Sequence, residues 1–148
     1  MSDTYQRVYA RIWDEPWTEP DRYLALYILT CRHRRFEGIY KLPVAYAADD
    51  LGWTRTKILA GLRRLQAAGF VDYDADTSVI WITSALKHQQ PNRNQAKSSA
   101  RQVLALPPSR LTEAFAKASR TLSPILAEAL GEASANGSQS LKASKLQS

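Results

Sequence analysis

The sequence predicts a mainly α-helical fold with a small β-hairpin, and three observations support this class. Apolar residues recur at helical spacing in several segments of the first 70 residues. Gly52 and Gly69 each end such a segment and are each followed by an aromatic residue, which is typical of a helix C-terminus. Two runs rich in β-forming residues then flank the turn at 74–77, which indicates a hairpin.

The first predicted helix begins near Glu19. Thr18 and Asp21 have the spacing of a capping box, and Pro20 lies in the first turn, where its missing N–H is tolerated. The preceding run, VYARIW at 8–13, alternates apolar and polar residues and fits either a short strand or a helix. A short strand is predicted for GIYKLP at 38–43.

Two further helices are predicted around a short glycine-containing turn. The first covers PVAYAADDL at 43–51, and the second runs to Ala68 with Thr54 as its N-cap. The link between them has about three residues and begins with Gly52, which is the helix-turn-helix arrangement. The run FVDYDADTSVIWI at 70–82 follows as the predicted hairpin.

We expect three regions along the 148 residues: a compact domain at 1–90, a basic helical extension at 91–130 and a disordered tail at 131–148. The extension contains two segments of helical spacing that Pro107 and Pro108 separate. The tail has no aromatic residue and few apolar ones, so it has little to bury.

Nothing in the sequence predicts a membrane or secretory segment. The most apolar run, 23–31, is much shorter than the roughly 20 residues of a bilayer helix, and the first ten residues contain no apolar signal core. We therefore expect a cytoplasmic protein. Cys31 is the only cysteine, so no intramolecular disulfide is expected, and its apolar surroundings are typical of a buried side chain.

The positive charge is concentrated in one part of the chain. The formal net charge is +6, and residues 84–120 contain seven basic residues against one acidic residue, Glu113. The rest of the chain is formally neutral, which points to a polyanionic partner for the basic part, with nucleic acid as the first candidate. The seven are Lys87, Arg93, Lys97, Arg101, Arg110, Lys117 and Arg120.

The helix that follows the turn has two distinct faces. At 100° per residue, Ile58, Leu62, Leu65 and Gly69 share a narrow sector that predicts the core side, and Gly61 lies on the flank, where a neighbouring helix can approach closely. The opposite face mixes hydrogen-bond donors with small side chains, which suits approach to base-pair edges, although a solvated surface has the same composition. Its members are Thr56, Lys57, Ala60, Arg63, Arg64 and Ala67.

The order helix, short strand, helix, turn, helix with LRRLQAAGFV, then hairpin resembles the winged helix-turn-helix domains over about residues 8–90. YARIW, LALYILT, GIYKLPVAYAADDLGW, VIWI and KHQQPNRNQAKSSARQVLALP together resemble phage and mobile-element replication initiators, or replisome organisers. This resemblance implies that the helix lies in the DNA major groove and that another region recruits a helicase or its loader. The matching positions are Arg55, Thr56, Lys57, Ala60, Arg63 and Arg64.

The hairpin departs from the DNA-binding wings of that family. It contains Asp72, Asp74 and Asp76 and no basic residue, so we do not expect it to contact phosphate. Our preferred hypothesis is that the basic extension takes over this electrostatic role, and the alternative is that the acidic hairpin meets a protein partner. The candidate phosphate-binding residues are Lys87, Arg93, Lys97 and Arg101.

Enzymatic chemistry is not predicted, and neither is a cofactor or a metal. An EF-hand loop that began at Asp72 would need glycine at position six and glutamate at position twelve. The sequence has Thr77 and Thr83 at these positions, so a calcium site is not predicted. His33 and His88 with one cysteine do not make a zinc site, and phosphate-binding glycine loops and nucleophile elbows are missing. Asp49 and Asp50 fit surface positions.

Two smaller patterns have open interpretations. RHRRF at 32–36 fits a solvated loop and a secondary phosphate contact equally well. The aromatic residues resemble a stacking platform for single strands, but their positions beside strand ends and caps favour core packing. They are Trp13, Trp17, Trp53, Trp81, Tyr40, Tyr46 and Tyr73.

The leading functional hypothesis is sequence-specific binding of double-stranded DNA in phage or mobile-element replication initiation. A transcriptional regulator, acting as a homodimer, uses the same DNA surface and is the first alternative. The second alternative is a protein-interaction module in which amphipathic segments dock a partner helix; the same segments also fit packing back onto the domain. Their apolar residues are Val103, Leu104, Leu111, Phe115 and Leu122.

Overall fold

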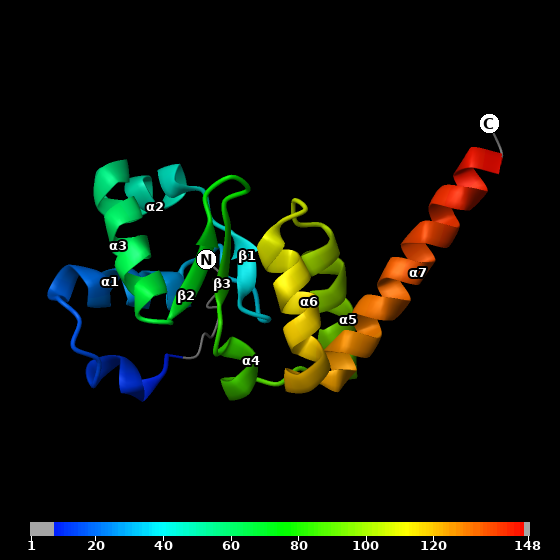
Figure 1. The fold of residues 1–148 in the computed structure, drawn as a ribbon, viewed down its shortest axis with the longest axis horizontal. Helices are drawn as coiled ribbons and strands as arrows, with labels where there is room; N and C mark the ends of the chain where they lie inside the picture. The colour runs from blue at the N-terminus through cyan, green and yellow to red at the C-terminus, as the bar shows by residue number, and fades with distance from the viewer. Residues whose placement is uncertain (1–7, 147–148) are drawn as a thin grey trace.

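The computed structural model describes the backbone of residues 8–146 and the side chains of residues 8–136, and it confirms the mainly helical class with a small antiparallel sheet (Figure 1). In chain order the elements are η1 (Ala10–Trp13), α1 (Glu19–Thr30), β1 (Ile39–Lys41), α2 (Val44–Leu51), α3 (Arg55–Ala67), β2 (Val71–Asp74), β3 (Val79–Ile82), α4 (Ala85–His88), α5 (Arg93–Leu104), α6 (Arg110–Leu122) and α7 (Pro124–Leu146).

Local signals place the first three α-helices where the sequence predicts them. The Thr18 hydroxyl accepts a hydrogen bond from the Asp21 amide at the start of α1, and Thr54 accepts one from the Lys57 amide at the start of α3. Gly52 ends α2 in the left-handed conformation. The run at 8–13, which fits a strand or a helix, contains the short 3₁₀ helix η1.

The predicted hairpin and the predicted short strand form one sheet with the order β1-β3-β2. Both neighbouring pairs are antiparallel; Tyr40 of β1 and Tyr73 of β2 each lie opposite Ile80 of the central strand. Strand β1 therefore ties the segment between α1 and α2 to the hairpin.

The central strand β3 contributes apolar side chains to both faces of the sheet. Ile80 and Ile82 belong to the core formed with α1, α2 and α3, whereas Val79 belongs to a second core with α5, α6 and α7. Trp81 packs against that second core, edge-on to Phe115 of α6 at 5.9 Å between ring centroids. Figure 1 shows the resulting layers, with the sheet between α1–α3 on one side and α5–α6 on the other.

The extension is helical, as predicted, and it packs onto the sheet instead of standing apart from it. Phe115 and Leu111 of α6 and Val103 of α5 are buried in the second core, together with Leu126 of α7. The first 90 residues therefore leave one sheet face uncovered unless the extension is present.

The segment expected to be a disordered tail, residues 131–148, differs from that expectation. Helix α7 continues through Gly131 to Leu146, and the last two residues lie outside the described part of the chain. The physical reason is that a low content of apolar residues disfavours burial but does not prevent helix formation. The segment has no proline to interrupt the helix that begins at Pro124.

We expect Gly38→Ala to destabilise the fold much more than Gly52→Ala. Both glycines have positive φ, +81° and +67°, which costs an L side chain roughly 1–2 kcal/mol. At Gly38 the added methyl would also lie 2.3 Å from the Ala85 Cβ, whereas nothing lies within 4 Å at Gly52. The measurement is the free energy of unfolding, with losses of about 2–4 kcal/mol for Gly38→Ala and about 1 for Gly52→Ala. Equal losses would contradict the close contact between Gly38, just before β1, and Ala85 at the start of α4.

Candidate nucleic-acid interface

Helix α3 presents the outer face that the sequence predicts. Ile58, Leu62 and Leu65 are buried in the core. Gly61 lies against α1, since an added Cβ would come within 2.6 Å of the Leu24 Cδ2, which confirms the predicted close helix approach. On the opposite side Ala60 is half-buried, and the exposed positions are Arg55, Thr56, Lys57, Arg63, Arg64 and Ala67.

Arg64 differs from the other residues of this face because it already has a partner. Its Nε and Nη2 each donate to a carboxylate oxygen of Asp21 at 2.8 Å. The Asp21 side chain is only 6% exposed, and its hydrogen bond is the main cause of the raised pKa of Arg64. This paired, forked contact fixes α3 against α1. Arg64 is therefore a positioning residue for the helix, although the sequence places it among the residues that read DNA.

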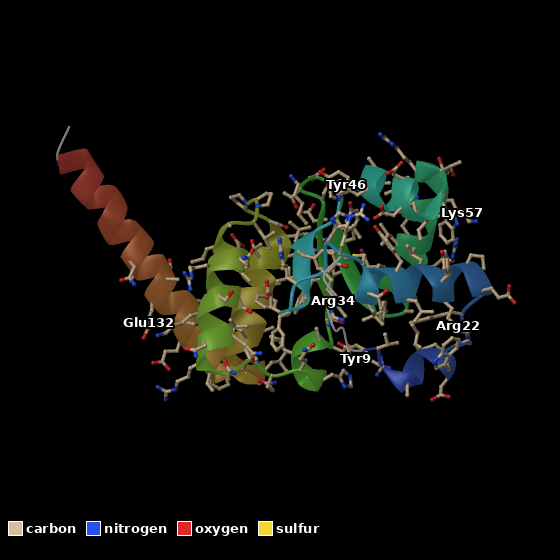
Figure 2. All side chains as sticks on the ribbon, turned by 180° about the vertical axis from the view of Figure 1, so that it is seen from behind. Tyr9, Arg22, Arg34, Tyr46, Lys57 and Glu132 are labelled. Carbon is tan, nitrogen blue, oxygen red and sulfur yellow. The ribbon has the colours of Figure 1, made fainter. Side chains whose placement is uncertain are left out.

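Lys57 is also oriented by a neighbour but remains at the surface. Its Nζ lies 4.0 Å from the ring centroid of Trp53, and that ring lies 5.9 Å from the ring of Tyr23 on α1. A cation above an aromatic face is held by the ring quadrupole. The first turn of α3 thus carries a preoriented positive charge, visible at the outer side of α3 in Figure 2.

The acidic hairpin is hydrogen-bonded to the basic extension of the same chain. Arg110 at the start of α6 donates to both oxygens of Asp72, at 3.2 and 3.3 Å, and to the Tyr73 carbonyl at 3.1 Å. The hydroxyl of Ser109, the N-cap of α6, donates to Asp74 at 2.7 Å, and this bond is the largest cause of the lowered pKa of Asp74. Asp72 likewise raises the pKa of Arg110. The acidic side chains of Asp72 and Asp74 are thus used in contacts within the same chain.

The predicted phosphate-binding residues do not join the α3 surface. Arg93, Lys97 and Arg101 recur every four residues and form one exposed stripe along α5. Glu128 and Glu132 of α7 border the same grooves, and Figure 2 shows Glu132 on α7 beside this layer. Helix α5, which carries the stripe, lies across the sheet from α3 (Figure 1), and Lys87 is separately exposed on α4. The α5 stripe therefore does not continue the exposed face of α3.

Asp50 organises the basic loop that follows α1. It accepts hydrogen bonds from the Tyr27 hydroxyl at 2.5 Å and from Arg32 at 2.7 Å, and the His33 Nε2 lies 3.4 Å away. The Tyr27 bond is the largest cause of the lowered pKa of Asp50. The sequence interpretation of Asp50 as a surface residue is wrong, because the loop folds back over the end of α2 and leaves its side chain 13% exposed.

The aromatic residues divide into two groups. Trp17 packs edge-on to Phe70, and Trp81 packs edge-on to Phe115, which confirms core packing for these residues. Trp13 is 62% exposed, with the Arg22 guanidinium 5.8 Å from its ring centroid, so core packing does not describe it. Tyr46 of α2 is 51% exposed.

The amphipathic segments considered for a partner helix cover the sheet of their own chain. Val103, Leu111 and Phe115 are buried, Leu122 packs against the same core, and Leu104 is 49% exposed. The interpretation in which these segments pack back onto the domain is thus confirmed for most of their apolar residues.

The buried acid Glu37 connects the loop after α1 to α5. It is 2% exposed, and its Oε2 accepts a hydrogen bond of 2.8 Å from the Ser99 hydroxyl. Burial raises its pKa above the ordinary glutamate range, with the Ser99 hydrogen bond and the charge of Arg35 opposing that shift.

Comparisons with known proteins provide no family assignment: no protein-family model matches the chain, and neither the curated proteins nor the solved structures contain a significant match. Within residues 8–136, no three His, Cys, Asp or Glu side chains are grouped closely enough to hold a metal ion. No helix in the described part of the chain combines the length and apolar character needed to cross a bilayer.

Arg64→Ala should lower the free energy of unfolding by about 1–2 kcal/mol, because it leaves the buried carboxylate of Asp21 without its forked partner. The loss is kept to this size because the Arg64 side chain itself is half-exposed and screened by solvent. The matched control is Arg63→Ala, which removes the same side chain one position earlier on the exposed face and should change stability by less than about 0.5 kcal/mol. Urea denaturation measures both. Equal stability of the two variants would show that the Asp21 contact does not fix α3.

Glu37→Gln should stabilise the protein increasingly as the pH rises. The folded-state pKa of Glu37 is raised, so wild-type stability falls as the pH increases from the unfolded-state pKa through the folded-state pKa, and glutamine removes that loss. Thermal unfolding of both proteins between about pH 4 and about pH 8 measures the difference. The exposed Glu113→Gln is the control and should give a nearly constant difference. If the thermal stability of Glu37→Gln and that of wild type changed in parallel with pH, the raised pKa of Glu37 would be ruled out.

Proposed function

We propose that this chain is a sequence-specific double-stranded DNA-binding protein whose helix α3 enters the major groove. The observation that carries the proposal is the exposed outer face of α3, which follows the helix-turn-helix link and presents Arg55, Lys57 and Arg63 on a helix anchored by its opposite side. A helix fits into the major groove, where arginine and lysine donate to guanine and small side chains permit close approach.

The roles within this face follow from the contacts. Arg63 is the main candidate for a base contact, because it is exposed and forms no ion pair in the described part of the chain. Thr56 and Ala60 provide the small side chains beside it. Lys57, held above Trp53, is suited to a phosphate or guanine contact at the start of the helix. Arg64 acts indirectly by holding α3 on α1.

The biological role that we propose is initiation of phage or mobile-element DNA replication, in the cytoplasm. What supports it is the resemblance of the element order and of the stretch after the hairpin to replication initiators. In this role the protein recognises an origin and recruits a replicative helicase or its loader. Repeated sites at an origin favour this role, whereas palindromic half-sites near a promoter favour a dimeric transcriptional regulator with the same DNA surface.

Arg63→Ala should weaken binding to the preferred duplex by about 1–3 kcal/mol, roughly 5- to 150-fold, and relax the preference at one base position. The experiment selects the preferred sequence from random duplexes with the full chain and then measures fluorescence anisotropy with both proteins. Lys117→Ala, an exposed change on α6, is the control with the same loss of one charge and should bind like wild type. No duplex binding by the full chain, even at low salt, would overturn the proposed function.

A further inference from the structure

The hairpin is unsuited to hold DNA phosphates beside α3. Its strand residues Asp72 and Asp74 are bound to Arg110 and Ser109 of α6. The basic stripe of α5 lies across the sheet and shares its grooves with two glutamates of α7. A duplex at α3 therefore needs another cationic surface attached to the helix-turn-helix if it is to be held by its backbone, as DNA-binding proteins generally hold it.

A groove of about 400 Å³ provides such a surface. It lies between the loop after α1, strand β1 and the end of α5. Arg32, Arg35 and Lys41 line it and are exposed, and Gln102 and Pro107 form the wall contributed by the chain at the end of α5. We call it the β1 groove. It gathers Arg32 and Arg35 of the RHRRF segment, for which the sequence left a phosphate contact open, and Lys41 of β1.

The β1 groove is attached directly to the helix-turn-helix. Arg32 is bound to Asp50 of α2 at 2.7 Å, and the ring of His33 lies 5.1 Å from the ring of Tyr46 on α2. Lys41 is followed at once by Leu42 and by Pro43, the N-cap of α2. Figure 2 shows Tyr46 between Lys57 of α3 and the layer formed by α5 and α6. The groove is thus attached by these contacts to α2, the first helix of the helix-turn-helix.

The charge of the groove is not cancelled by its own acids. Asp50 pairs with Arg32, but in the described part of the chain neither Arg35 nor Lys41 forms an ion pair. Glu37 is the acid at the base of the groove; it is 2% exposed and its carboxylate is hydrogen-bonded to Ser99. Arg35 and Lys41 are therefore exposed and form no ion pair in the described part of the chain, although the charge of Arg35 also acts on the buried Glu37.

We propose that the β1 groove binds backbone phosphates of the same duplex whose major groove α3 enters, through Arg35 and Lys41 with Arg32 as a third contact. This inference rests on the proposed function. It assigns to the β1 groove the electrostatic role that the acidic hairpin does not serve and that the sequence suggested for α5. A single-stranded nucleic acid is the competing source of the same phosphate chemistry.

The test compares two charge-matched double variants of the full chain. Arg35→Gln with Lys41→Gln removes two exposed cations from the β1 groove, and Lys97→Gln with Arg101→Gln removes two from α5. Anisotropy with a labelled random duplex at several salt concentrations should give a slope of log K against log salt that is smaller by about 2 for the groove variant, at roughly 0.9 per phosphate contact. At low salt, affinity should fall about tenfold or more. The α5 variant should match wild type.

Further outcomes separate the two proposals. Arg35→Lys with Lys41→Arg should restore the slope, and unchanged thermal unfolding should show that both double variants are folded. If the groove variant keeps the wild-type slope while Arg63→Ala still loses specific binding, the groove inference is wrong and the proposed function stands. A loss confined to the α5 variant, or a groove effect seen on single strands and not on duplex, would also overturn the inference. If neither Arg63→Ala nor either double variant changes duplex binding, both proposals fail.

Discussion

The three-stranded sheet carries apolar side chains on both of its faces, and both faces must therefore be covered. The central strand β3 alone sends Ile80 and Ile82 to one side and Val79 and Trp81 to the other. The α1–α3 layer covers the first side and the α5–α7 layer covers the second. The rest of the architecture follows from this requirement, because the extension has to dock on the outer face of the hairpin and cannot serve as a separate arm.

Docking of the extension decides which surfaces remain for a partner. Alternation along β2 points Asp72 and Asp74 away from the first core, toward the start of α6, where Arg110 and Ser109 bind them. The hairpin is thus a structural link between the two layers. The exposed face of α3 and the β1 groove remain, the groove lying where the loop after α1 and strand β1 meet the end of α5, and the cationic surface used for DNA is proposed to join these two.

The parts of the structure set by local chemistry could be predicted from the sequence. Thr18, Thr54 and Gly52 mark helix ends by short-range rules, and the period of the apolar residues identifies the core side of α3. Contacts between distant residues could not be predicted: Asp21 and Arg64 are 43 positions apart, and Asp72 and Arg110 are 38 apart. Charge composition identified a basic region at 84–120 but not the side of the sheet that it faces. One further signal is present in the sequence, since a strand that is apolar at Val79, Ile80, Trp81 and Ile82 indicates burial on both faces.

The central claim is that duplex DNA binds the exposed face of α3 and the β1 groove together. The most direct measurement is a titration of the ¹⁵N-labelled full chain with a short random-sequence duplex, followed by amide chemical shifts. The full chain is required because a truncation at Gln90 would uncover Ile39, Val79 and Trp81. The account predicts salt-sensitive shifts along the exposed face of α3, from Arg55 to Arg63, and around Arg35 and Lys41. Shifts confined to α5, α6 and α7, with α3 unaffected, would contradict it.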